Sequence, residues 1–165
     1  LALLRKKAGY CTEAEQLLEH ADPTAVNSII EDLNKQWNET ASLKDTDTEQ
    51  AIQQRYRKLR DALMAGTEQR DKLLNELQAN LEHRKELCLR MEILCGADSP
   101  AEEQQARMEF QANRLAEAIG HGVDDPVGSV TDLEREWYLS AGARPGQEKD
   151  LQERFEKARK TAGQQ

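Results

Sequence analysis

Apolar residues recur along most of the chain at spacings of three and four, the pattern of an amphipathic helix. The clearest stripe follows Asp22-Pro23 and consists of Val26, Ile29, Ile30, Leu33 and Trp37. No segment of the sequence shows the alternation that predicts a strand. The pattern therefore predicts an all-α fold, arranged as an elongated array of antiparallel helical hairpins.

A second regular run predicts one long central helix, from about Asp47 to Cys95. Its spacings alternate between four and three, which is the period of a coiled-coil seam. The seam consists of Arg70, Leu74, Leu77, Leu81, Arg84, Cys88, Met91 and Cys95. We expect a continuous helix. The alternative is a break at Gly66-Thr67, because Gly suits a C-terminal cap and Thr an N-terminal cap.

After the turn at residues 96–99, a further helix is predicted to run to about Ile119. Ser99 and Glu102 have the spacing of a capping box, in which two side chains satisfy free backbone amides reciprocally. The apolar stripe of this helix is Met108, Ala112, Leu115 and Ile119. We expect the stripe to cover the long helix and form a hairpin with it.

The most informative feature is an internal repeat, whose two copies match at an offset of 100 residues and, after their loops, of 99. In the first part Ile30, Asp32, Leu33 and Trp37 correspond to Val130, Asp132, Leu133 and Trp137. In the second part Glu49, Ile52, Arg55, Tyr56, Leu59 and Leu63 correspond to Glu148, Leu151, Arg154, Phe155, Ala158 and Ala162.

Each copy predicts a helix that ends near Trp, a loop, and a returning helix. The end of the first helix then lies beside the start of the second. The predicted repeat core consists of Trp37 against Ile52 and Tyr56, and of Trp137 against Leu151 and Phe155. The chain divides accordingly into residues 1–22, which end a preceding repeat, repeat A (23–65), a central hairpin (66–122) and repeat B (123–163).

These elements resemble a bacterial family of single or tandem helical repeats, known only as domain of unknown function three hundred and forty-nine. Its pattern is a Trp, a loop with Gly and Pro, and a helix with Arg-Phe. Repeat B matches this pattern through Trp137, Gly142, Pro145 and Arg154-Phe155. Repeat A has Trp37 and Arg55-Tyr56 but lacks Gly and Pro in its loop.

Residues 87–94, followed by Asp98-Ser99-Pro100 and Arg107-Met108-Glu109, are also similar to the C-terminal region of proteobacterial members. The resemblance implies a helical-repeat fold in the cytoplasm of a bacterium and no established activity. The chain begins within what already reads as a helix, so we expect it to be part of a longer protein.

Composition narrows the classes of function. The net charge of -8 and the pI of about 5.0 argue against a general duplex-DNA binder, because phosphate neutralisation needs a positive surface. No apolar run approaches the roughly 18 residues that a membrane span requires. We therefore expect a cytoplasmic protein without membrane association, in which Cys11, Cys88 and Cys95 are reduced and buried.

The sequence shows no constellation that predicts catalysis. Its three histidines are more than 35 residues apart, and no Ser or Cys has a recognisable nucleophile motif around it. Cys88 and Cys95 are too far apart on a helix to share one zinc. A phosphate-binding loop is missing from the sequence. We expect no enzymatic activity, no cofactor and no metal.

The candidate polar or interaction residues are basic. They are Arg55, Arg57, Lys58, Arg60, Arg154 and Lys157. In one interpretation Arg55 and Arg154 pair with Asp32 and Asp132, or lie over the Trp rings, while the others form a solvated face. In the other, the two basic helices contact phosphates of RNA or DNA. Interspersed acidic residues favour the first interpretation.

The predicted function is a non-enzymatic helical-repeat scaffold or interaction module of a larger cytoplasmic bacterial protein. Its partners would be other proteins or further repeats of the full-length chain. The alternative is a nucleic-acid- or ribosome-associated accessory protein that uses its basic helix faces. The seam over residues 70–95 pairs either within the chain or with a second copy, and both alternatives stay open.

Overall fold

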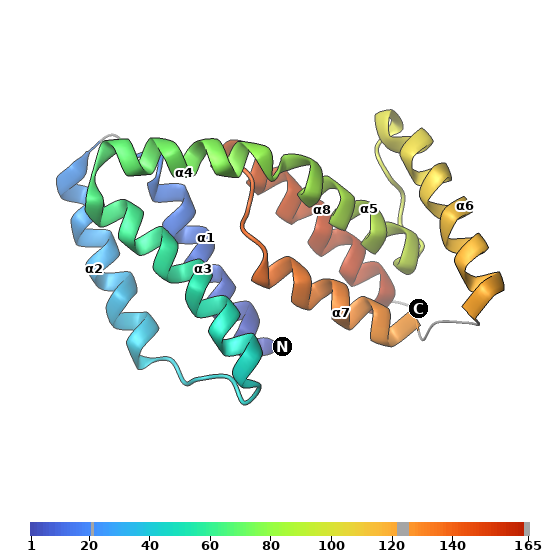
Figure 1. Cartoon of the computed structure of the whole chain (residues 1–165), viewed down its shortest axis with the longest axis horizontal. Helices are drawn as coiled ribbons and strands as arrows, with labels where there is room; N and C mark the ends of the chain where they lie inside the picture. Colours follow the sequence, from blue (N-terminus) through green and yellow to red (C-terminus); the bar gives the residue numbers. More distant parts are fainter. Residues whose placement is uncertain (21, 122–125, 164–165) are drawn as a thin grey trace. The chain divides into compact units, whose positions relative to one another are not determined.

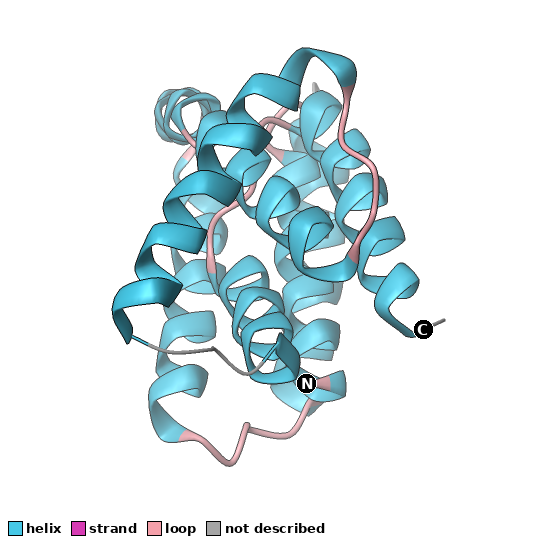
Figure 2. Cartoon of the chain, turned by 90° about the vertical axis from the view of Figure 1, so that its right-hand side faces the viewer, coloured by secondary structure: helices cyan, strands magenta, loops and turns pink. Residues whose placement is uncertain are grey.

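The computed structural model describes residues 1–20, 22–121 and 126–163. Within these ranges all regular elements are helices and none is a strand (Figure 2), which confirms the all-α fold class. The elements are α1 (Ala2–Leu17), α2 (Pro23–Glu39), α3 (Thr46–Ala65), α4 (Thr67–Ala79), α5 (Leu81–Cys95), the 3₁₀ helix η1 (Ala101–Glu103), α6 (Gln104–His121), α7 (Pro126–Leu139) and α8 (Pro145–Gly163). None of the described helices has the length and apolar character needed to cross a bilayer.

The chain forms two compact units, each built from two stretches of sequence. The first unit contains Leu1–Glu82 and Arg135–Glu148, and the second contains His83–Glu134 and Lys149–Gln165. Helices α7 and α8 are therefore each divided between the two units. The predicted elongated array and the four-part division stay predictions.

In the first unit α1, α2 and α3 pack against one another, and α4 packs on α3 (Figure 1). Their apolar stripes supply the core. It includes Leu4, Cys11, Ala14, Val26, Ile30, Leu33, Ile52, Tyr56 and Leu59. Helix α2 begins as predicted, because the Asp22 side chain accepts a hydrogen bond from the Thr24 amide and Pro23 occupies the first turn. Ile29 is the exception in its stripe and is 38% exposed.

The predicted continuous central helix is wrong. Helix α3 ends at Ala65 and α4 begins at Thr67, and Gly66 between them has φ 116° and ψ −171°. Only glycine adopts this conformation without strain. The conformation interrupts the hydrogen bonds of the helix. A second interruption lies at Asn80, between α4 and α5.

Most residues of the predicted seam are nevertheless buried. In the first unit these are Arg70, Leu74 and Leu77, and in the second they are Arg84, Cys88, Met91 and Cys95. A second copy of the chain would have to displace the side chains that cover them before it could pair through this seam.

The predicted role of the α6 stripe is wrong for the side chains that can be checked. Met108 is 64% exposed, Leu115 is 65% exposed and Ala112 is exposed as well, while the side chain of Ile119 lies outside the described residues. The capping box is also not formed, because the N-cap residue of η1 is Pro100, without a side-chain cap hydrogen bond. Ser99 Oγ instead donates to Glu92 Oε1 at 2.7 Å and accepts from Arg107 Nη1 at 2.9 Å. Helix α6 begins only at Gln104, after η1.

Candidate functional site

The predicted repeat core of the first copy is centred on an aromatic stack. The Trp37 ring lies on the Tyr56 ring with centroids 4.2 Å apart and planes 5° apart, which confirms the predicted contact. Tyr10 approaches Trp37 edge-on at 6.3 Å. Ile52 and Tyr56 are buried, and Trp37 is half-buried. The three rings thus connect α1, α2 and α3.

In the second copy, Trp137, Leu151 and Phe155 are likewise buried. Trp137 belongs to the first compact unit, whereas Leu151 and Phe155 belong to the second. Their predicted contact stays a prediction.

A cation does lie over the Trp37 ring, but it is Lys7 and not Arg55. Lys7 Nζ is 5.0 Å from the ring centroid and forms a buried ion pair with Glu49. The Tyr56 hydroxyl donates to Asn34 Oδ1 of α2. Burial raises the pKa of Tyr56 to about 12, so this hydroxyl stays protonated at neutral pH.

Arg55 is buried in the first unit. Its Nη2 donates to Glu15 Oε1 at 2.6 Å, and its Nη1 donates to the Tyr138 carbonyl at 2.6 Å. Burial alone would lower the pKa of Arg55, but the charge and hydrogen bond of Glu15 outweigh it and the pKa is raised. The expected pairing with Asp32 is wrong, because α1 packs on α3 and brings Glu15 to the guanidinium, while Asp32 is exposed on α2.

The same carboxylate holds the loop at residues 140–144. Glu15 Oε2 accepts a hydrogen bond from the Gly142 amide at 2.7 Å, and Asn80 Nδ2 donates to the Gly142 carbonyl at 3.2 Å. One residue further on, the Ala143 amide donates to Glu148 Oε1 at 2.9 Å. The loop is thus bound through its backbone to three side chains of its own unit.

Gly142 is required here because of close approach. A Cβ at this position would lie 2.9 Å from Glu148 Cδ and 3.0 Å from Glu15 Oε2. Both neighbours are buried carboxylates that already accept hydrogen bonds from the loop, so neither can move without losing one. The glycine of the loop pattern therefore has a steric function.

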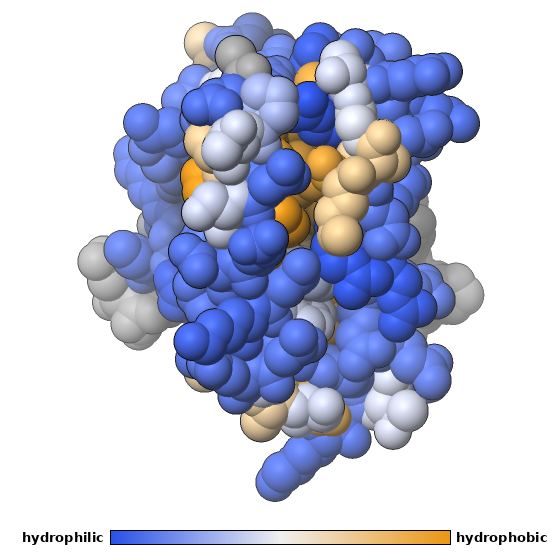
Figure 3. Space-filling model, turned by 90° about the vertical axis from the view of Figure 1, so that its left-hand side faces the viewer, coloured by the Kyte–Doolittle hydropathy of each residue, from blue (hydrophilic) through white to orange (hydrophobic). Residues whose placement is uncertain are grey.

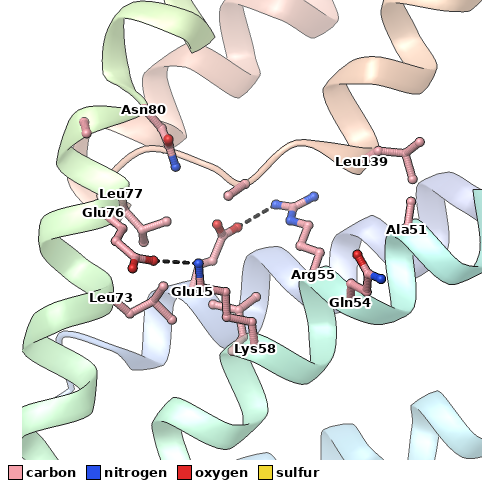
Figure 4. A pocket seen from close by; sticks show the side chains of 13 residues that line it. Glu15, Ala51, Gln54, Arg55, Lys58, Leu73, Glu76, Leu77, Asn80 and Leu139 are labelled. Atoms are coloured by element: carbon pink, nitrogen blue, oxygen red, sulfur yellow. Dashed lines mark hydrogen bonds and ion pairs between the residues drawn. The ribbon is translucent and has the colours of Figure 1, made fainter.

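Beside this cluster the first unit contains a cavity of about 630 Å³ (Figure 4). It is lined by Glu15, Ala51, Gln54, Arg55, Lys58, Leu59, Leu73, Glu76, Leu77, Ala79, Asn80, Leu139 and Ala141. We call this space the α3–α4 cavity. Its lining includes two ion pairs, Glu15 with Arg55 at 2.6 Å and Lys58 with Glu76 at 2.7 Å.

Arg154 has an equivalent cross-linking position in the second unit. Its Nε donates to Glu92 Oε2 and its Nη1 to Glu103 Oε2, both at 2.7 Å. The hydrogen bonds from Arg154 to these two carboxylates outweigh the effect of burial and raise its pKa. The expected partner Asp132 is replaced by the carboxylates of α5 and η1.

The remaining basic candidates are more exposed than Arg55. Arg57, Lys58 and Lys157 are exposed, and Arg60 is half-buried beside Asp61, with Nη2 3.2 Å from Oδ1. Lys58 alone of these lies at the α3–α4 cavity.

Sequence reasoning missed the acidic partners and Lys7. A signal was present on α1, where Lys7, Cys11 and Glu15 lie four residues apart on one face. All three are buried, which shows that this face carries charges into the core. Glu49 and Glu148 matched in the repeat, and both are also buried.

The three cysteines are free and buried, as expected. Burial raises the pKa of the Cys11 thiol to about 12, so it is not a thiolate nucleophile at neutral pH. Among the described residues, no three His, Cys, Asp or Glu side chains gather as metal ligands would.

Comparison with known proteins found no matching family model, no similar curated protein and no similar solved structure.

Proposed function

We propose that this chain is a non-enzymatic helical-repeat scaffold, part of a larger cytoplasmic bacterial protein, which presents its helix surfaces to protein partners or to further repeats. The observation that carries the proposal is the shared use of Arg55 and Arg154. These two residues correspond in the repeat, and each cross-links separate segments of its own unit through carboxylates.

Both arginines are committed to structure. Arg55 connects α3 to α1 and to the end of α7, whereas Arg154 connects α8 to α5 and η1. A guanidinium whose pKa is raised stays charged at neutral pH and cannot act there as a general base. The guanidinium groups of Arg55 and Arg154, which would be prominent candidates for a catalytic role, thus hold helices together.

The exposed surface suits protein partners better than a polyanion. The face seen in Figure 3, on the side of α2, is mostly hydrophilic, with apolar atoms chiefly in its upper half. Basic side chains on α3 lie beside acids, as Lys58 beside Glu76 and Arg60 beside Asp61. Together with the net charge of -8, this mixture gives little attraction for phosphates.

The proposal is tested by affinity capture of the full-length protein from its native host, with and without nuclease. A charge-reversed variant, Arg57→Glu with Lys157→Glu, is captured in parallel, because both side chains are exposed. We expect protein partners that survive nuclease and that bind the variant as well. Fluorescence anisotropy with labelled duplex DNA and single-stranded RNA measures direct binding at low and moderate salt.

Partners that disappear with nuclease, together with salt-sensitive nucleic-acid binding that the charge reversal abolishes, would contradict the scaffold proposal. Those results would establish the accessory protein that binds nucleic acid through its basic helix faces. Turnover of a substrate by the purified chain would contradict the non-enzymatic part.

A further inference from the structure

We propose that the α3–α4 cavity is a binding site for a neutral group that combines a leucine-sized aliphatic chain with an amide. This inference goes beyond the scaffold proposal and does not depend on it. It rests on the size, apolar walls and balanced charges of a cavity that belongs entirely to the first unit.

Part of the cavity wall is apolar and is formed by three helices and a loop. Leu59 comes from α3, Leu73 and Leu77 come from α4, and all three are buried. Leu139 and Ala141 line the cavity from the end of α7 and the following loop. A volume of about 630 Å³ lies within the range of small-molecule sites, about 300–1,000 Å³. The loop is itself fixed by Glu15 and Asn80, so this wall is held in place.

Charge at the cavity argues for a neutral occupant. Its four charged side chains form two ion pairs, Arg55 with Glu15 and Lys58 with Glu76. A ligand carboxylate or ammonium would have to separate one of these pairs or remain without a counter-charge. The Arg55–Glu15 pair is the harder to open, because its side chains are only 4% and 2% exposed.

Polar groups at the cavity suit an amide. Gln54 and Asn80 lie on different sides of it (Figure 4), and each amide side chain can donate and accept hydrogen bonds. Arg55 Nε is buried and has no hydrogen-bond partner within residues 1–20, 22–121 and 126–163. A carbonyl oxygen would supply the missing acceptor after a small side-chain adjustment, and would leave the Glu15 pair intact.

The test is a titration of the full chain with N-acetyl-leucinamide, followed by ¹H–¹⁵N NMR. We expect saturable shifts at the amides of Ala51, Leu77 and Ala141, which line the cavity. N-acetyl-alaninamide lacks the aliphatic chain, and N-acetyl-leucine carries a carboxylate. Each should bind at least about tenfold more weakly than N-acetyl-leucinamide.

A cavity-filling variant locates the site. Ala79→Leu adds bulk from an exposed position at the end of α4, and should weaken binding by at least about tenfold. Ala106→Leu is the matched control, because Ala106 is exposed on α6 and does not line the cavity. It should bind like the natural chain. Ala51→Leu fills the same space from α3, and this variant replaces Ala79→Leu in the titration if Ala79→Leu does not fold.

The blocked pentapeptide Ala-Ala-Leu-Ala-Ala distinguishes the source of the ligand. Equal or tighter binding than N-acetyl-leucinamide indicates a segment of a partner protein, and weaker binding indicates a free small molecule. Absence of saturable shifts, equal binding of N-acetyl-alaninamide or N-acetyl-leucine, or unchanged binding to a folded cavity-filling variant would overturn the proposal. Because the titration uses only the purified chain, such a failure leaves the capture experiment and the scaffold proposal unaffected.

Discussion

The two stretches of sequence that match each other, the copies of the predicted repeat, share an apolar pattern but differ in their polar partners. Ile52 and Leu151 are 0% and 6% exposed, and Tyr56 and Phe155 are each 2% exposed. The equivalent arginines differ more, because the Arg55 side chain is 4% exposed and the Arg154 side chain is 15% exposed.

The carboxylates that bind these arginines come from outside the repeated helices. Glu15 lies on α1, Glu92 on α5 and Glu103 on η1. The two arginines occupy matching positions in the sequence, whereas the carboxylates that they bind come from neighbouring elements that do not match. A repeated motif can retain one cationic position while each copy is fixed to a different neighbour.

The largest difference between the copies is expected from removing the arginines. Arg55→Ala leaves Glu15 as a buried charge without a cation, and should lower the free energy of unfolding of the first unit by about 3–5 kcal/mol. Arg154→Ala should cost about 1–3 kcal/mol, because Glu103 is partly exposed and Ser99 still donates to Glu92. Urea denaturation followed by far-ultraviolet circular dichroism measures both variants, because every described element of both units is helical. Tryptophan fluorescence adds a separate readout of the first unit, which contains Trp37 and Trp137.

Lys58→Ala is the control, since it removes an exposed pair with Glu76 and should change stability by less than about 1 kcal/mol. Equal losses for Arg55→Ala and Arg154→Ala would show that burial does not distinguish the two copies.

Truncating the indoles should give the next largest effects. Trp137 is 5% exposed, so Trp137→Ala should lower the free energy of unfolding by about 3–4 kcal/mol. Trp37 is half-buried, and Trp37→Ala should cost about 2–3 kcal/mol through loss of the stack on Tyr56. Thermal and urea denaturation measure both variants. A larger loss for Trp37→Ala would mean that the aromatic stack matters more than burial.

The loops provide a third comparison. Gly142→Ala forces a Cβ against Glu148 and Glu15, and should cost about 1–3 kcal/mol. Ser42 follows Trp37 at the same distance as Gly142 follows Trp137, but it is exposed, so Ser42→Ala should change stability by less than about 0.5 kcal/mol. Denaturation with urea again supplies the values, and a neutral Gly142→Ala would refute the steric function of the glycine.

The smallest expected effect concerns alkaline pH and the position at which the first copy has Tyr56 and the second has Phe155. The folded-state pKa of Tyr56 is raised from 10.0 to about 12, mainly by burial. The stability that this group contributes is therefore fully present below pH 10 and is lost as the pH rises through about 12.

Tyr56→Phe should reduce the loss of stability over this pH range, measured as the change in thermal midpoint. Cys11 contributes in the same direction, because burial raises its pKa from 9.0 to about 12. The double variant with Cys11→Ala should flatten the profile further. An unchanged profile in the double variant would exclude both groups as the cause.

The helical pattern and one of the aromatic contacts could be predicted from the sequence because they depend on short-range spacing. Helix α2 follows from Asp22-Pro23 and its apolar stripe, and Trp37 meets Tyr56 because a short loop returns the chain beside it. Burial of Ile52 and Phe155 follows from the same periodicity.

The ion pairs, the cavity and the α6 surface could not be predicted in this way. Whether Arg55 binds Asp32 or Glu15 depends on which helix packs against α3, and local spacing carries no such information. The exposure of Met108 depends likewise on where α6 begins after η1. At Gly66 the sequence was compatible with a continuous helix and with a break. The positive φ of this residue ends α3, and α4 begins at the next residue.

The hydrogen bond from Gly142 to Glu15 joins residues that are 127 positions apart. The first unit is consequently discontinuous in sequence, and its opening helix leaves the ribosome long before the loop that completes it. Until that loop is synthesised, Arg55 lacks the Tyr138 carbonyl and Glu15 lacks one of its donors. Such a unit closes late, by a long-range contact that slows folding, and the nascent chain must remain unaggregated in the meantime.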